Sequence, residues 1–469
     1  MLVLAIDGLR ADHVGLLGYD RDTTPSIDAR IRERGVAFTQ AFSASPEMIP
    51  SHAALLTGCD PGLVNQPLPP GVVAPFAPER RSLLPENAPS LAAEFLGEGF
   101  ATTCFADHAW LAPDVGFFRG FERFDEFAGG LELDEEDIGA SRLGRRLFSW
   151  VRSLGRDRDW FAYLQINDLE RGLRHAGEGL GRRFEPRPEL DEVPPVVEAQ
   201  RAFFAVPSAL WPGGQRTVGE YEATYDELLR RLDEKLGRMF ARLDALGHDE
   251  LTICIVGTYG MGFGESGLYL DHGTLSDVDL HVPVLISLPA STTLERGVLS
   301  DSLVSTIDLA PTLLEVVGLP QAPWMHGHSQ VPALRDPEGP PVREACFSTG
   351  GVSAGFAVHD DRYSYQQTTH AIRGDGDLRR SWYGTPDPPR RELRRHLRDR
   401  RSGSGPGDQE PSAANKKRAA ELEALAEDWL GWIETARLEL HDPPWREEAL
   451  EPQVLEELRR RGLVPPAPQ

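Results

Sequence analysis

Three short apolar runs, each followed at once by polar residues, constrain the fold of this chain more than any other feature. They cover residues 2–6, 160–166 and 251–257. Runs that are apolar at almost every position are typical of strands buried on both faces, as in parallel sheets covered by helices. Because the carboxyl ends of such strands lie at one edge of the sheet, we expect the polar residues that follow them to lie near one site.

Amphipathic helical patterns alternate with these strands. The clearest covers residues 221–247, with leucines, Met239 and Phe240 on one stripe. The alternation predicts a large α/β domain over residues 1–335, with a mostly parallel sheet sandwiched by helices. From 336 to 469, short β-type runs and a closing helix predict a smaller α+β domain with an antiparallel sheet, which includes a flexible Arg/Gly/Ser-rich loop at 379–415.

Composition excludes several classes of protein. The chain is 40% hydrophobic and 26% charged, which is ordinary for a soluble globular protein. No stretch approaches the roughly 18 apolar residues that a membrane span needs. The 49 basic and 73 acidic residues give a net charge of −24, which argues against a nucleic-acid partner.

The beginning of the chain and its cysteines bear on the cellular compartment. Residues 1–6 are apolar but lack a basic segment, so they indicate a buried strand and not a signal peptide. The sequence as it stands therefore predicts a cytoplasmic protein, whereas a late start that removed a leader would allow secretion. Four widely spaced cysteines without metal-binding spacing predict buried free thiols: Cys59, Cys104, Cys254 and Cys346.

Residues 43–58 predict a turn that feeds a helix, with Pro50 in its first turn and Gly58 at its end. A helix entered in this way can present a side chain where free N–H groups favour a phosphate or a sulfate. The segment MIPSHAALLTG at 48–58 resembles the nucleophile segment of the sulfatase family within the alkaline phosphatase superfamily. The residues that fit the family pattern are Pro50, Ser51, His52, Leu56, Thr57 and Gly58.

The resemblance extends over essentially the whole chain, in order and in spacing. Further matching segments lie at residues 7–39, 91–125, 258–289 and 303–330. The resemblance implies the alkaline phosphatase fold and the hydrolysis of a sulfate or phosphate ester with the help of a divalent metal ion.

The same resemblance implies that most of the catalytic positions are substituted. Met48 stands at the nucleophile position, and a thioether has no proton to lose and cannot attack an ester. Of the positions that hold the metal, Asp7 is retained, whereas Gly8, Thr258 and Tyr259 replace other ligands. One carboxylate does not hold a hard cation strongly, so we expect no cofactor and no strong binding of Ca²⁺ or a similar ion.

Other positions that contact the ester in the family are retained. They are His52 and His272, with Asp168 nearby by analogy, whereas Ser51 is interpreted as a hydroxyl at the helix start. Gln165 and Glu170 fill two further polar positions of the loop that contains Asp168. We expect the predicted site residues to converge around one cleft: Asp7, Met48, His52, Asp168, Thr258, Tyr259 and His272.

Three hypotheses follow. The first is a pseudoenzyme that binds a small anionic ester or a protein partner. The second is a working hydrolase with a rewired site, in which His52 or His272 activates Ser51 or a water and Asp168 or Glu170 orients the base. The third is a structural or interaction protein whose cleft is filled by Met48 and Tyr259. An open pocket would favour the first two, and a plugged one the third.

Overall fold

We analysed a computed structural model of the chain. It describes residues 1–64, 66–67, 82–84, 90–108, 111, 116–126, 140–155, 158–174, 183–197, 206–207, 216–265, 269–323, 325–336, 339–350, 355–368, 396–399 and 413–440. Most of the predicted loop 379–415 and all of residues 441–469 lie outside these ranges.

An eight-stranded sheet forms the centre of the molecule, in the order β14-β2-β13-β10-β1-β7-β5-β6. All its strand pairs are parallel except those of β13, which runs antiparallel to β10 and β2. The three apolar runs of the sequence become β1 (Leu2–Ile6), β7 (Trp160–Ile166) and β10 (Ile253–Gly257), and they lie side by side. The predicted mostly parallel sheet is therefore confirmed.

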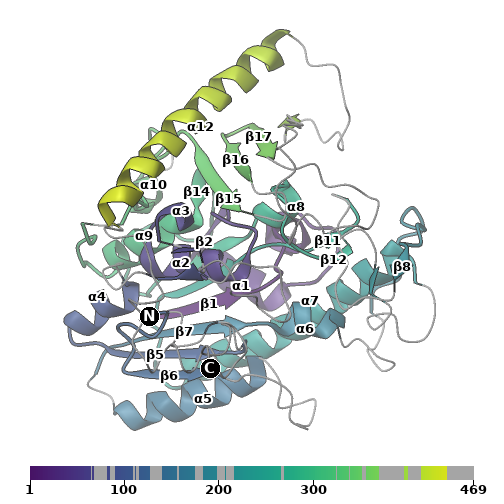
Figure 1. Ribbon diagram of the computed structural model, residues 1–469. Helices are drawn as coiled ribbons and strands as arrows, with labels where there is room; N and C mark the ends of the chain where they lie inside the picture. The colour runs from purple at the N-terminus through teal and green to yellow at the C-terminus, as the bar shows by residue number, and fades with distance from the viewer. Residues whose placement is uncertain are drawn as a thin grey trace, which may run out of the picture.

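Helices cover both faces of this sheet (Figure 1). Alternate residues of β1 point to opposite faces, so Val3 and Ala5 join one hydrophobic cluster while Leu2 and Leu4 join the other. The first cluster includes residues of α2 (Met48–Thr57), α4 (Leu91–Gly97) and α9 (Leu309–Val316). The second includes residues of α1 (Pro25–Arg34), α5 (Ala140–Leu154) and α7 (Val218–Ala245).

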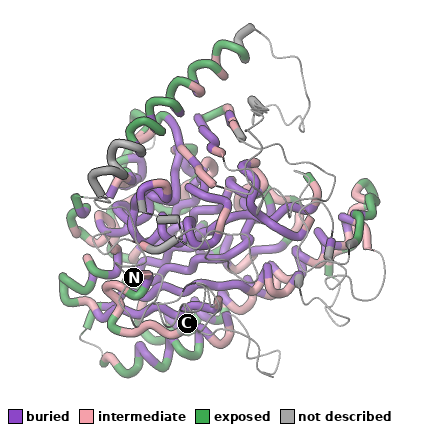
Figure 2. Tube along the Cα trace, viewed as in Figure 1, coloured by how far each residue is buried: buried purple, intermediate pink, exposed green. Residues whose placement is uncertain are grey.

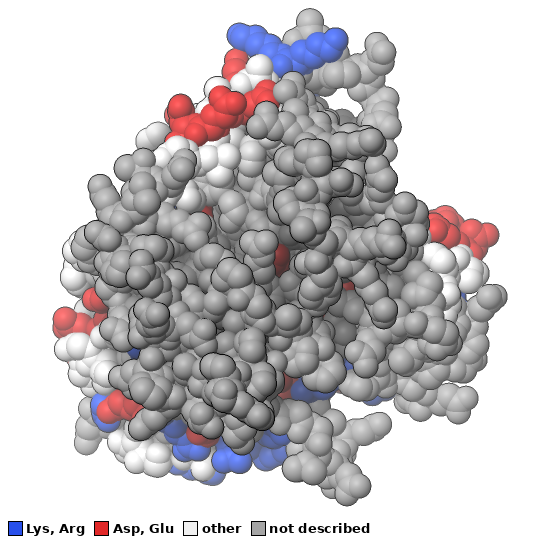
Figure 3. All heavy atoms as spheres, viewed as in Figure 1, with Lys and Arg blue, Asp and Glu red and all other residues white. Residues whose placement is uncertain are grey.

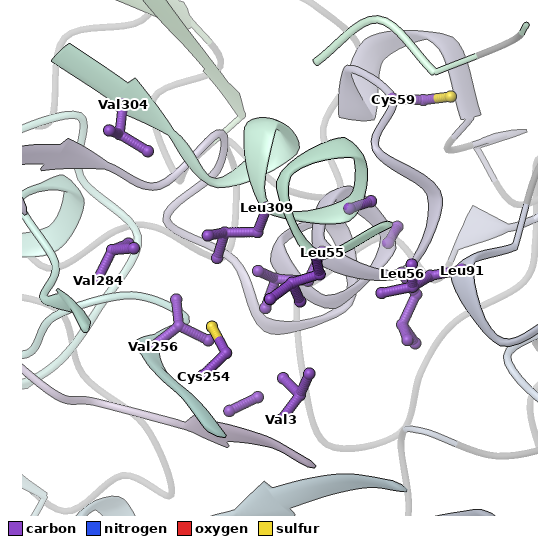
Figure 4. Packing of buried hydrophobic residues seen from close by; sticks show 14 of the residues in the cluster. Val3, Leu55, Leu56, Cys59, Leu91, Cys254, Val256, Val284, Val304 and Leu309 are labelled. Carbon is purple, nitrogen blue, oxygen red and sulfur yellow. The ribbon is translucent and has the colours of Figure 1, made fainter. Parts of the chain in front are cut away.

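The packing between α2 and the sheet fixes the position of the predicted nucleophile segment. Figure 4 shows Leu55 of α2 and Leu309 of α9 lying over Val3 and Cys254 of the central strands. All ten residues of α2 are buried. Figure 2 shows the same contrast for the whole molecule, with buried central strands and exposed residues along the outer helices.

The remaining strands of the central sheet flank these three, and short elements connect them. The strands are β2 (Gly35–Phe42), β5 (Ala101–Ala106), β6 (Arg123–Glu126), β13 (Val284–Ser287) and β14 (Val298–Ser305). The short helices are α3 (Pro61–Val64), α6 (Asp168–Arg174), α8 (Asp277–Leu280) and α10 (Val331–Arg335). Three two-stranded ribbons pair β3 (Gln66–Pro67) with β4 (Ser82–Leu83), β8 (Val196–Val197) with β9 (Val206–Pro207), and β11 (Gly262–Phe263) with β12 (Tyr269–Asp271).

A second, antiparallel sheet follows, as predicted for the C-terminal part. Its strands are β15 (Cys346–Gly350), β16 (Gly355–His359), β17 (Tyr363–Thr368) and β18 (His396–Asp399). The long helix α12 (Ala413–Leu440) runs along the outer edge of the molecule beside this sheet (Figure 1). Its buried residues share the hydrophobic cluster of α2 and α9, so the C-terminal part has no separate core within the described residues.

All four cysteines are buried and none forms a disulfide, as predicted. None of the described helices is long and apolar enough to cross a membrane. On the face that Figure 3 shows, acidic side chains gather over α12, where Glu421, Glu427 and Asp428 are exposed, while basic ones gather at the opposite end, near α5.

Candidate functional site

The carboxyl ends of β1, β7 and β10 bring a polar group together around Asp7. Its side chain is fully buried, and each of its two oxygens accepts hydrogen bonds. Oδ1 accepts from the hydroxyl of Thr258 at 2.7 Å and from His52 Nε2 at 3.0 Å. Oδ2 accepts from Gln165 Nε2 at 2.5 Å and from Asn167 Nδ2 at 3.4 Å. The lone pairs of this carboxylate are therefore directed at four protein donors.

His52 connects this carboxylate to the core through Tyr163. Its Nδ1 lies 2.6 Å from the hydroxyl of Tyr163, on β7. Burial raises the pKa of Tyr163 well above its usual value, so the hydroxyl keeps its proton and can donate to Nδ1. A carboxylate oxygen can only accept a hydrogen bond, so Nε2 of His52 carries the ring proton and donates it to Asp7 Oδ1. Both ring nitrogens of His52 are thus engaged inside the protein.

Helix α2 carries Met48 and Ser51 into the same region. The helix begins at Met48 and ends at Gly58, whose φ of 64° is left-handed and suits glycine, as the sequence predicts. Met48 is 4% exposed and packs in the hydrophobic cluster. Ser51 lies within the first turn of the helix, and its hydroxyl lies 2.6 Å from the carbonyl of Ser45 and 2.8 Å from that of Glu47.

Tyr259 fills the space beside the Asp7 group. It is fully buried, its hydroxyl donates to Glu170 at 3.0 Å, and its ring stacks on His272 with centroids 4.1 Å apart. His272 is 3% exposed, and its Nδ1 donates to the carbonyl of Pro46 at 2.7 Å. The structure therefore brings Tyr259, Glu170 and His272 together as packed and hydrogen-bonded side chains.

Asp168 has hydrogen-bond partners other than the Asp7 group. It begins α6, and its carboxylate accepts from the backbone N–H of Ala140 at 2.9 Å and from Lys235 at 2.7 Å. No hydrogen bond or ion pair given for the described residues links Asp168 to Asp7 or His52. Sequence reasoning kept Asp168 because it matched the family pattern, whereas Gln165 and Glu170 of the same segment are the residues that reach the site.

Two residues of this network escaped the sequence analysis. Tyr163 looks like an ordinary core aromatic in an apolar run, and Asn167 looks like the first residue of a loop. The available signal was position alone, because Asn167 directly follows β7 at the edge where Asp7 follows β1. Tyr163 gave no such signal, since only the approach of α2 makes its hydroxyl a partner of His52.

Asp107, which directly follows β5, lies next to this network. Its carboxylate pairs with Arg171 and Arg142, and burial raises its pKa against the lowering effect of Arg171. Its backbone N–H donates to Gln165 Oε1 at 2.6 Å, so Gln165 bridges Asp107 and Asp7.

The residues present do not fit a divalent metal ion. Such an ion needs about six hard ligands, mostly carboxylate oxygens. Here the oxygens of Asp7 accept hydrogen bonds from Thr258 and Gln165. The hydroxyl of Tyr259 is directed at Glu170, and the thioether of Met48 is a soft and weak ligand. Within the described ranges, no three His, Cys, Asp or Glu side chains are grouped so that they could hold a metal.

Comparison with known families identifies the class of protein. The Sulfatase family model matches residues 1–140, and the model for the C-terminal part of N-sulphoglucosamine sulphohydrolase matches residues 264–364. The fold, with its helix-covered sheet, is similar to that of a solved Vibrio parahaemolyticus protein in the alkaline phosphatase superfamily, with a TM-score of 0.51 at 16% identity, covering 78% of this chain and 76% of that one. The two family-model matches support an assignment of the chain to the sulfatase family.

Individual relatives agree with this assignment. The chain is 23% identical over 415 residues to a Delta 4,5-hexuronate-2-O-sulfatase of Bacteroides thetaiotaomicron, covering 80% of both proteins. Among solved structures, a 2-O GAG sulfatase superposes with a TM-score of 0.67 at 20% identity, covering 92% of each chain. A phosphonate monoester hydrolase from Silicibacter pomeroyi superposes with a TM-score of 0.64 at 18% identity, covering 93% of this chain and 95% of that one. At these identities the superpositions establish the fold alone.

Proposed function

We propose that this chain is a sulfatase-fold protein that does not hydrolyse esters by the metal-dependent route, and that it acts by binding a partner. The observation that carries the proposal is the buried Met48 at the nucleophile position. The hydroxyl nearest to it along α2, that of Ser51, is directed at the carbonyl of Ser45. Neither side chain can serve as the attacking group in this arrangement.

The contacts of the two histidines argue against a rewired site. A working base would lie within hydrogen-bond reach of a nucleophile. His52 instead uses both ring nitrogens on Asp7 and Tyr163, and Nδ1 of His272 binds the carbonyl of Pro46. Within the described part of the chain, the hydrogen bonds of Ser51 include none to a histidine.

Burial favours a protein partner over a small ester held at the old site. Tyr259 and His52 are fully buried, His272 is 3% exposed and Glu170 is 7% exposed. An ester or its metal ion could reach the oxygens of Asp7 only by displacing the hydrogen bonds that Thr258, Gln165 and His52 make to them. This arrangement supports the third hypothesis, a filled cleft, and we propose that a partner binds at the outer surface.

A turnover assay tests the proposal. The substrates are an aryl sulfate, a phosphate monoester, a phosphodiester, a phosphonate monoester and, because of the relatives, an unsaturated hexuronate 2-O-sulfate. We expect no turnover above buffer, with or without Ca²⁺, Mg²⁺, Mn²⁺ or Zn²⁺. The expected deficit is about 10⁴-fold or more, because loss of a nucleophile alone has that effect in hydrolases.

Variants separate the possible causes of any turnover. Metal-dependent turnover that disappears in Asp7→Ala would contradict the proposal and indicate an active sulfatase. Metal-independent turnover that disappears in Ser51→Ala or His52→Ala would instead indicate the rewired site. Ser149→Ala, an exposed serine on α5, is the control that should change nothing in either case.

A further inference from the structure

We infer that Asp7 is a structural residue, whose carboxylate joins β1, β7, β10 and α2 in the place where the family's divalent ion is expected. The hydrogen-bond donors around Asp7 stabilise its carboxylate, as a bound cation would. This inference deepens the proposed function and rests on it in one respect, since it assumes that the site performs no metal-dependent step. Its own support is the set of contacts around one buried carboxylate.

The donors come from segments far apart in the sequence. Asn167 and Gln165 belong to β7 and its end, Thr258 follows β10, and His52 lies on α2. Backbone pairing already holds β7 and β10 on either side of β1, but α2 packs across the sheet and shares no ladder with it. The hydrogen bond from His52 to Asp7 therefore connects α2 to the end of β1. A second hydrogen bond, from Tyr163 on β7, holds the ring of His52 in place.

All members of this group are buried, so their polar atoms depend on one another, and not on water, for hydrogen bonds. Asp7, His52, Gln165 and Thr258 are fully buried, and Asn167 is 3% exposed. A buried donor without an acceptor costs the full free energy of removing it from water, whereas a hydrogen bond inside the protein offsets that cost. Removal of the Asp7 carboxylate would leave several donors without that acceptor at once, so the effects of changing Asp7 and its donors should depend on one another.

A divalent cation would compete with these donors at a disadvantage. To reach the oxygens of Asp7 it would have to displace the protons of Thr258 and Gln165, which approach to 2.7 and 2.5 Å. It would find no second carboxylate among the substituted ligand positions, which hold Gly8, Met48, Thr258 and Tyr259. The donor set therefore favours a bare carboxylate over a metal-bound one.

A double-mutant cycle followed by thermal unfolding tests the structural role. Thr258→Val removes the hydroxyl with little change of shape, and we expect it to lower the Tm by about 2 °C or more in the wild type. The loss should be markedly smaller when Asp7 is already alanine. Thr57→Val is the matched control, because Thr57 is a buried threonine on α2 whose hydroxyl binds the carbonyl of Ala53. Its effect should be the same with and without Asp7.

Equal effects of Thr258→Val in both backgrounds would overturn the inference. If Asp7→Ala does not fold, Asp7→Leu serves as the second background, because it has a similar shape but offers no acceptor to Thr258. The same reduced effect of Thr258→Val is expected there, and an unreduced effect would again overturn the inference.

Metal analysis supplies an independent readout. The protein is dialysed against EDTA, then against CaCl₂, MgCl₂, MnCl₂ or ZnCl₂, and finally against buffer. We expect well under one equivalent of bound metal and no change of Tm. One equivalent that Asp7→Ala fails to retain would overturn the inference, even if no substrate turns over. Turnover without metal would contradict the proposed function and leave this inference standing.

Discussion

At the scale of single residues, Asp279 is a buried carboxyl group that lacks part of its hydrogen bonding. Its Oδ2 accepts from the backbone N–H and the hydroxyl of Thr274, at 2.6 and 2.5 Å. Its Oδ1 has no partner in the described structure. Burial raises the pKa of Asp279 to about 7, against the lowering effects of Thr274, His272 and Arg10. The charged form is therefore unfavourable in the folded protein.

This shift predicts a pH dependence of stability. Because the pKa is raised in the folded state, the protein gains stability at acid pH and loses it as the pH rises from about 4 to about 7. Asp279→Asn keeps the acceptor for Thr274 and removes the charge. The variant should gain stability over the wild type at pH 8, at most on the order of 4 kcal/mol, and gain less at pH 5. Urea unfolding at both pH values measures this, and an equal gain at both would contradict the assignment.

At the scale of elements, the hairpin of β11 and β12 contains a strained residue. Leu270 has a φ of 55°, the only positive value among the described residues other than glycine. Left-handed backbone costs an L-residue about 1–2 kcal/mol. Leu270 is 4% exposed, so the burial of its side chain offsets this strain. The strain lies two residues before His272 and helps to set the path of the segment that carries it.

Two variants of Leu270 separate strain from packing. Both Leu270→Ala and Leu270→Gly should be less stable than the wild type, because each loses a buried side chain. Leu270→Gly should nevertheless be more stable than Leu270→Ala, by about 1 kcal/mol, since glycine adopts this φ without strain. Leu275, which is 2% exposed and has no positive φ, is the control where alanine should be the more stable replacement. The same order at both positions would rule out strain at Leu270.

At the scale of the whole molecule, α12 packs the C-terminal part against the helices that cover the central sheet. Trp429 is 9% exposed, stacks on Phe347 of β15 at 4.7 Å, and forms a side-chain hydrogen bond with Asp60, just before α3. Its neighbours in the hydrophobic cluster include residues of α2 and α9. We propose that the boundary near residue 335 separates two architectures that unfold as one cooperative unit.

Substitution of Trp429 tests this coupling. Trp429→Ala should lower the free energy of unfolding by about 3–5 kcal/mol, because a large buried side chain is lost. Calorimetry should show one transition that moves to lower temperature. Trp432→Ala, on the same helix but 42% exposed, should change stability far less. Two separate transitions, with only the smaller one shifted by Trp429→Ala, would show that the two parts unfold independently.

Much of this fold follows from local sequence patterns. The apolar runs at 2–6, 160–166 and 251–257 predict strands, and the stripe at 221–247 predicts α7, because burial imposes a period on each element. The turn into α2 and its end at Gly58 follow from the conformational preferences of proline and glycine. Family membership also follows, since it depends on the order of short motifs.

The sequence by itself thus determined the fold class, because that depends on residue type and local period, and by resemblance it predicted that Met48 stands at a nucleophile position. Only the tertiary structure decided the partners of Asp7, which lie 45 to 251 positions away along the chain. It also decided that Glu170, and not Asp168, joins Tyr259, and that Tyr163 supports His52. The physical reason is that a hydrogen bond depends on where side chains from separate strand ends and helices meet, which no local pattern records.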